Sequence, residues 1–215
     1  MRVEHKGIFA EVLEVAGIKP AITSMRNPMN SWHLSDSGFA FSHEGEDMVY
    51  VIGDKDLDLA QRLIKAGTEH CKFLRQISVW LDLNLPRYVW SEFDTYHFNT
   101  KNSCSTMHKL FAKNKTLSKD DFYVEYPEML MVLNPTIEML NEIGEKYLEN
   151  KDMKYLRMAK SLLPESFLQR RTVSTNYAEL RTIYHQRKNH RLDSEWGVVI
   201  KAIESLPCAK ELIML

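Results

Sequence analysis

Residues 77–85 read Ile-Ser-Val-Trp-Leu-Asp-Leu-Asn-Leu, with Pro86 directly after them, and this stretch decides the fold class. Apolar residues occupy every second position, which is the spacing that places them on one face of a half-buried β-strand. Pro86 lacks the N–H that a sheet needs and has the fixed φ of a first helical turn. We therefore expect the strand to end there and a helix to follow over residues 87–94.

The segment behind that helix, residues 98–108, reads Phe-Asn-Thr-Lys-Asn-Ser-Cys-Ser-Thr-Met-His and is expected to be a loop. Hydroxyl groups and free backbone amides in a short loop can bind a phosphate without a large positive charge. Clusters of Ser, Thr and Asn are more often solvated turns. The composition of this segment alone leaves both interpretations open.

The N-terminal part is expected to hold a strand over residues 3–15, a short helix over 18–26 and a loop over 27–47. Residues 56–66 carry apolar side chains at helical spacing. Gly67 is placed to end that helix, because glycine readily adopts the positive φ of a helix C-terminus.

Two further helices are expected over residues 136–148 and 153–163. Lys160 falls in the last turn of the second one. A lysine there complements the helix dipole, and it can also bind an anion, so a structural and a functional role both stay open.

A β-branched stretch, residues 172–175, precedes a helix expected over 177–188. Asn176 with Glu179 three residues later resembles a capping box at the start of that helix. Arg187 continues the apolar stripe of the helix, so its guanidinium should lie along the buried face and needs a partner. An ion pair or a snorkelling stem would suffice, and the functional alternative is a planar fork that grips a phosphate or an imide.

Composition and charge narrow the class of protein. The 215 residues include 28 Lys and Arg against 29 Asp and Glu, a net charge of −1, whereas binding nucleic acid through its phosphates normally needs a basic excess. The three cysteines form no CxxC pair, no secretory leader is visible, and the longest apolar runs, such as residues 129–133, are too short to cross a bilayer. We expect one cytoplasmic domain over residues 1–215 that contacts neither nucleic acid nor a membrane.

The common catalytic and metal-binding patterns are absent from the sequence. There is no GxSxG, GxGxxG, Walker A, HExxH or CxxC motif. His185 and His190 are five residues apart and do not share a helix face, and Glu92 and Asp94, two apart on a helix, face different ways. Any chemistry should therefore depend on a cofactor.

One arrangement of residues does match a known pattern. Pro86 opens an aromatic-containing helix, Thr95-Tyr96-His97 follows it, and Ser105 comes after seven further residues. This resembles the flavin-dependent thymidylate synthases, the ThyX family, in which a strand ending in Pro and such a helix precede Arg-His-Arg, seven residues and Ser. Asn102, Ser103 and Thr106 lie where the family has Asn, Glu and Gly.

The resemblance extends over the whole chain. The family's basic residue before Leu-Pro, its Thr-Val-Asn segment and its Leu-Arg helix end correspond in order to Lys160, residues 175–176, Leu180, Arg187 and His190. Two N-terminal segments also correspond to the family: Ser24-Met25-Arg26 and Asn30-Ser31-Trp32.

The resemblance implies a fold and an activity. The fold would be α+β, a single mixed α/β domain with an antiparallel sheet and flanking helices, assembled as a homotetramer with sites where subunits meet. The activity would be conversion of dUMP to dTMP with methylenetetrahydrofolate and NADPH through FAD. Trp90, Phe93, Met129 and Met131 are candidates for the subunit interface.

The resemblance also implies roles for individual residues. Arg187 and Ser105 would be catalytic, with Arg187 gripping the uracil and stabilising its developing negative charge. The dUMP-binding residues would be Glu92, Ser103, Ser105, Thr106, Lys160 and Arg187. Of these, Ser103, Ser105 and Thr106 would hold the phosphate beside Lys160. The flavin-binding residues would be Ser31, Thr95, Tyr96, His97, Asn102, Asn176 and His190.

The departures from the family pattern keep three interpretations open. Thr95, Tyr96 and His97 supply no permanent charge, Glu92 stands where the family has Gln, and Met107 stands where it has Arg. A lost Arg at a phosphate forfeits a charge-assisted hydrogen bond of about 1.5–3 kcal/mol. The protein is then a divergent thymidylate synthase, a related enzyme with hydroxymethylation or another pyrimidine nucleotide, or a non-enzymatic nucleotide-binding protein.

Overall fold

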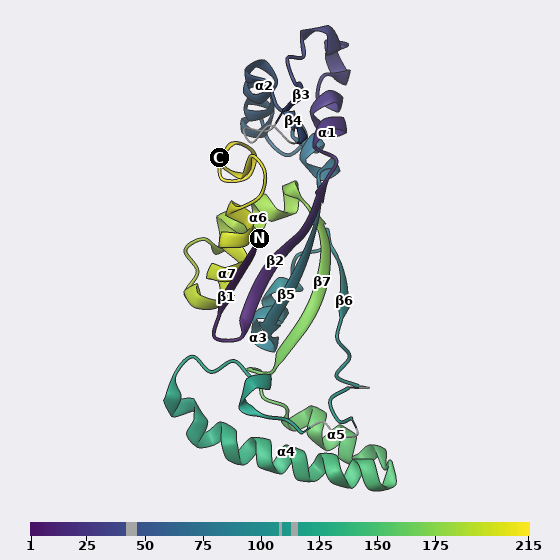
Figure 1. Ribbon diagram of the computed structural model, residues 1–215, viewed down its shortest axis with the longest axis vertical. Coiled ribbons are helices and arrows are strands. Elements are labelled where there is room, and N and C mark those ends of the chain that lie inside the picture. Colours follow the sequence, from purple (N-terminus) through teal and green to yellow (C-terminus); the bar gives the residue numbers. More distant parts are fainter. Residues whose placement is uncertain (42–46, 108, 113–115) are drawn as a thin grey trace.

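The computed structural model describes residues 1–41, 47–107, 109–112 and 116–215. The molecule is elongated, with a five-stranded sheet in the middle, a helical tier with a small hairpin at one end and a long helix with a shorter one at the other (Figure 1).

The central sheet is antiparallel throughout, in the order β1-β2-β5-β7-β6. Its strands are β1 (Arg2–His5), β2 (Ile8–Ala16), β5 (Ser78–Pro86), β7 (Leu168–Asn176) and β6 (Thr100–Ser103). The alternation predicted for β5 is confirmed, since Val79, Leu81, Leu83 and Leu85 are fully buried. The predicted α+β class with an antiparallel sheet is confirmed as well.

Two strand predictions were wrong in detail. The expected single strand over residues 3–15 is a hairpin, because Lys6 and Gly7 both have positive φ (44° and 87°) and form the two-residue turn that joins β1 to β2. The expected loop over 98–108 contains the edge strand β6, which pairs with β7 from Thr100↔Ser174 to Ser103↔Arg171. Pairing with a neighbouring strand outweighs the weak strand propensity of its small polar residues.

Helices cover one face of this sheet. They are α3 (Arg87–Phe93), α6 (Tyr177–Arg187), α7 (Asp193–Glu204) and the short α8 (Ala209–Leu212). Trp90 and Phe93 of α3 are fully buried in this core, so they do not form an exposed subunit interface as the sequence had suggested.

The tier above the sheet contains α1 (Ile18–Ser24), α2 (Asp54–Lys65) and the hairpin of β3 (Gly38–Phe41) and β4 (Met48–Val51), with 3-10 turns at Asn27–Met29, Trp32–Leu34 and Lys72–Gln76. The expected loop over 27–47 therefore contains two 3-10 turns and the strand β3, and its residues 42–46 lie outside the described part. Buried Asp56 organises this tier by accepting hydrogen bonds from Arg26, Ser35 and Ser37. Burial alone would raise the pKa of Asp56, but these donors hold it below its usual range.

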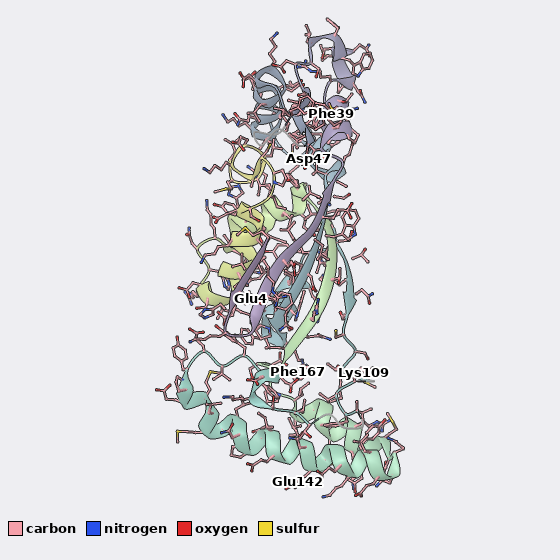
Figure 2. All side chains as sticks on the ribbon, in the orientation of Figure 1. Glu4, Phe39, Asp47, Lys109, Glu142 and Phe167 are labelled. Carbon is pink, nitrogen blue, oxygen red and sulfur yellow. The ribbon has the colours of Figure 1, made fainter. Side chains whose placement is uncertain are left out.

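The tier below the sheet is built by α4 (Leu130–Asn150) and α5 (Met153–Leu162), with 3-10 turns at Lys119–Asp121 and Pro127–Met129. Helix α4 begins before the expected residue 136 and continues through Pro135, because Leu133 packs with Ile137 and Leu140 in a second hydrophobic cluster. Phe167 links this cluster to the lower end of the sheet (Figure 2). Among the described residues, no helix has the length and apolarity that crossing a membrane would require.

Candidate functional site

The helices α3 and α6 approach each other over the covered face of the sheet. Helix α3 starts at the Pro86 end of β5, and α6 starts at Asn176, which pairs with Ser78 at the other end. The nine residues of β5 span about 30 Å at ~3.3 Å each. The seven and eleven residues of the two helices span about 10 and 16 Å, so their C-terminal ends meet near the middle of the strand.

Arg187 is the centre of a polar cluster at this meeting point. Its Nη1 lies 2.8 Å from Oε2 of Glu92 and 2.9 Å from Nε2 of His190, and its Nε donates to the Tyr96 hydroxyl at 2.9 Å. The guanidinium carbon lies 4.7 Å from the ring centre of Trp196. The cation on the buried stripe thus has an anionic partner within its own chain, which is the ion-pair alternative considered from the sequence.

Part of the hydrogen-bonding capacity of this cluster is uncommitted. Oε2 of Glu92 accepts from both Arg187 and the indole N–H of Trp196, at 2.8 and 2.9 Å. Among the described residues, neither Oε1 of Glu92 nor Nη2 of Arg187 has a hydrogen-bond partner. The pair therefore offers one uncommitted acceptor oxygen and one uncommitted donor nitrogen, which is what recognition of the edge of a heterocyclic base requires.

The carboxylate of Asp94, directly after α3, has different surroundings. Asp94 forms ion pairs with Arg171 at 3.1 Å and Lys101 at 3.3 Å, on the β6–β7 side of the helix. Glu92 and Asp94 do face different ways, as their spacing predicts.

A second polar cluster lies where β6 leaves the sheet. The Cys104 N–H donates to the Arg170 carbonyl at 2.9 Å and anchors the chain just after β6. Thr106 then lies against α5, where its hydroxyl accepts a hydrogen bond from the Lys160 ammonium at 2.5 Å. Ser105, next to Thr106, is half-buried, whereas Ser103 ends β6 and is exposed.

The two clusters are separate within one chain. Helix α5, which carries Lys160, lies at the lower end of the molecule, and α6, which carries Arg187, lies beside the upper half of the sheet (Figure 1). Lys109, close to Thr106 in the sequence, lies at the level of Phe167 (Figure 2). A ligand that touched both clusters would need them from different subunits.

Four of the expected flavin-binding residues line one cavity of about 390 Å³: Thr95, Tyr96, His97 and Asn176. The wall formed by residues 95–98, and Asn99 directly after it, are held by Glu179, a buried carboxylate in the first turn of α6. It accepts hydrogen bonds from the Phe98 N–H (2.5 Å), Asn99 Nδ2 (2.9 Å) and the Thr175 hydroxyl (2.7 Å).

The three other expected flavin-binding residues lie elsewhere. Ser31 is in the upper tier, where its carbonyl lies 3.5 Å from Nη1 of Arg26. Asn102 is on β6 opposite Thr172, and His190 belongs to the Arg187 cluster. The chain by itself does not bring these residues to the cavity.

Sequence reasoning missed several residues of these sites. Trp196 and Gln186 contact the Arg187 cluster through Glu92 and Tyr96, and Arg75 and Arg181 line the cavity. No motif identifies them, because their positions depend on how α6 and α7 pack. Asn176 caps α6 as expected, but the Glu179 carboxylate is hydrogen-bonded to residues 98 and 99 and to Thr175.

Comparison with known proteins supports the fold. No protein-family model and no curated protein matches the chain. Two crystal structures of the flavin-dependent thymidylate synthase ThyX from Helicobacter pylori with FAD and dUMP superimpose with a TM-score of 0.70 at 18% identity, covering 95% and 96% of this chain and 97% of the other. The UMP/dUMP methylase PolB from Streptomyces cacaoi, bound with 5-Br dUMP, superimposes at 0.63 with 14% identity, covering 92% and 88%. The chain therefore has the fold of the flavin-dependent thymidylate synthases.

Proposed function

We propose that this protein is a flavin-dependent enzyme that modifies C5 of a pyrimidine nucleotide, converting dUMP to dTMP with methylenetetrahydrofolate and NADPH. The observation that carries the proposal is the Arg187 cluster. It presents a fixed guanidinium beside a cavity lined by Thr95, Tyr96, His97 and Asn176. The fold is also similar to that of enzymes whose structures contain dUMP or 5-Br dUMP, and this similarity supports a pyrimidine nucleotide as the substrate.

In this proposal the residues of the chain bind and polarise the nucleotide. Arg187, held by Glu92 and Tyr96, would direct its uncommitted Nη2 at a ring carbonyl and stabilise negative charge that develops there. Lys160 and Thr106, with Ser105 beside them, would bind the phosphate. Because the two clusters are separate in one chain, the phosphate site and the ring site would come from two subunits of a homotetramer.

The residues around the cavity fit a flavin dinucleotide. The cavity has the size of a ligand pocket, it is mostly apolar, and Nε of Arg181 at its wall is buried without a hydrogen-bond partner among the described residues. Bound FAD would supply hydride transfer, which no side chain can perform. Tyr96 and His97 would contribute ring surfaces in place of the family's arginines.

The proposal is tested with the purified protein. We expect flavin absorbance, and conversion of dUMP to a product heavier by one methylene when methylenetetrahydrofolate and NADPH are supplied. A nucleotide product carrying a hydroxymethyl group would point to the related enzyme. Nucleotide binding without flavin and without product would leave a non-enzymatic binding protein.

A second candidate substrate follows from Glu92. Uncommitted Oε1 of a carboxylate is a good acceptor for the exocyclic amino group of cytosine, while Nη2 of Arg187 can donate to the adjacent ring nitrogen. The second candidate function is therefore C5 modification of a cytosine nucleotide. Comparing dCMP with dUMP as substrates tests it, and Glu92→Gln should shift the preference toward dUMP.

A further inference from the structure

The cavity beside α6 contains positive charge that the sequence pattern does not account for. Its walls are the turn at Lys72–Gln76, residues 95–98 and the first turns of α6. Two arginines line it, Arg75 from the turn and Arg181 from α6. Neither belongs to the residues that match the family motifs.

The two arginines are largely uncommitted. Arg181 donates from Nη2 to the backbone oxygen of Leu215 at 2.7 Å, its Nε is buried without a partner, and its Nη1 makes no hydrogen bond among the described residues. Arg75 is exposed and forms no hydrogen bond or ion pair within the described part of the chain. A buried guanidinium N–H group without an acceptor, such as Nε of Arg181, is costly, so a ligand that supplies an acceptor there would bind favourably.

No free carboxylate among the residues that line the cavity competes for these cations; Glu69, next to the lining residue Thr68, is paired with Lys72, and Arg75 also lowers its pKa. Glu179 is the acidic residue among the lining side chains, and its two oxygens already accept three hydrogen bonds from Phe98, Asn99 and Thr175. The cavity thus combines two available guanidinium groups with a mostly apolar wall. Phe98, with 74% of its surface exposed, adds an aromatic ring at the rim.

We infer that Arg75 and Arg181 bind the pyrophosphate of a dinucleotide in this cavity, with FAD as the occupant. The inference rests on the proposed flavin-dependent function and names the groups that replace the charge absent from Thr95-Tyr96-His97. A planar guanidinium with free N–H groups suits phosphate oxygens, and the apolar wall suits an adjoining ring system.

The test measures dissociation constants of the protein, residues 1–215, for FAD, ADP and inorganic pyrophosphate by calorimetry at two salt concentrations. We expect Arg75→Gln and Arg181→Gln each to weaken FAD and ADP binding about tenfold, which is about 1.4 kcal/mol. The double variant should bind about a hundredfold more weakly and show a smaller salt dependence. Arg2→Gln, a surface arginine paired with Glu4, is the matched control and should bind like the wild type.

The outcomes separate this inference from the proposed function. If FAD binds to the wild type and to the double variant with equal affinity, the inference is wrong and the flavin function stands. If the wild type binds ADP and pyrophosphate but not FAD, and the variants lose that binding, the arginine site is supported and the flavin function fails. Absence of binding to all three probes overturns both. Arg181→Lys, which keeps the charge, should retain more affinity than Arg181→Gln and guards against a folding defect.

Discussion

The guanidinium of Arg187 combines three roles at a single residue: it pairs with Glu92, bonds the Tyr96 hydroxyl and lies over Trp196. A lysine could keep the charge but not the planar set of donors. We expect Arg187→Lys to lower kcat by about 100-fold or more with the fold intact, as for other transition-state donors. Steady-state kinetics with dUMP and a circular dichroism spectrum check this.

Arg191→Lys is the control for this variant, since Arg191 is an exposed arginine four residues further along the chain. It should leave turnover unchanged. A near wild-type rate for Arg187→Lys would show that the assigned role is wrong.

Lys160 is the residue that we expect to bind the phosphate of dUMP. Its ammonium is already hydrogen-bonded to Thr106, so a phosphate placed there would meet an ammonium, a hydroxyl and the neighbouring Ser105. We expect Lys160→Met to weaken dUMP binding at least tenfold and to leave deoxyuridine binding unchanged, because a charge-assisted contact is worth about 1.5–3 kcal/mol. Lys154→Met on the same helix is the control. Equal wild-type affinities for dUMP and deoxyuridine would rule out the phosphate site.

Glu125 links stability to pH. Hydrogen bonds from Tyr123 and then from His5 lower the pKa of Glu125 to about 2. A carboxylate with a depressed folded-state pKa contributes stability above its unfolded pKa, near 4.5, and loses that contribution as the pH falls toward 2. We expect the free energy of unfolding of Glu125→Gln to lie below that of the wild type at about pH 6 and to converge with it in acid. Urea titrations across this range would contradict the prediction if the two curves stayed parallel.

At the scale of elements, Glu179 joins helix α6 to the segment that follows α3. Its carboxylate receives donors from Phe98, Asn99 and Thr175, and a glutamine would turn an N–H group toward some of them. We expect Glu179→Gln to lower the free energy of unfolding by about 1–3 kcal/mol. Urea unfolding measures this, with Glu145→Gln on the exposed side of α4 as the control.

Hydrogen exchange of the Phe98 amide tests the contact between Glu179 and this segment independently of unfolding. The Phe98 amide of Glu179→Gln should exchange hydrogen faster than in the wild type, because its hydrogen bond to the carboxylate is weakened. Unchanged stability together with unchanged Phe98 exchange would show that Glu179 does not hold this segment.

At the scale of the whole molecule, apolar side chains remain exposed on both end tiers. They include Phe39, Phe41 and Met48 on the β3–β4 hairpin, and Met131 and Val132 on α4. Exposed apolar surface of this extent commonly marks a contact between proteins. Of the four interface candidates from the sequence, Met131 is 80% exposed and Met129 36%, while the two aromatic ones are core residues.

We therefore expect a homotetramer of about 100 kDa from four chains of 25.2 kDa, with FAD lost on dissociation. The reason is that the Arg187 and Lys160 clusters, and the Ser31 and His97 positions, are separate in one chain. Light scattering combined with flavin absorbance measures both quantities. A stable monomer that still carries FAD would contradict the shared site.

The local pattern of the sequence was sufficient for most elements. The alternation before Pro86 determined the central strand and the helix after it, and apolar periodicity determined α2, α5 and α6 within a few residues. The start of α6 could be predicted from Asn176, because a capping side chain bonds a backbone N–H only a few residues further along the chain. These features follow from interactions within a few residues, which a sequence displays directly.

Only the tertiary structure decided the rest. Segment 100–103 is a strand because β7 lies beside it, and Arg187 is paired because α3 and α6 run toward each other over the same face. Arg75 and Arg181 line the same cavity although they are 106 positions apart in the sequence (181 minus 75). Such contacts depend on how whole elements pack, and the composition of a short segment does not encode that.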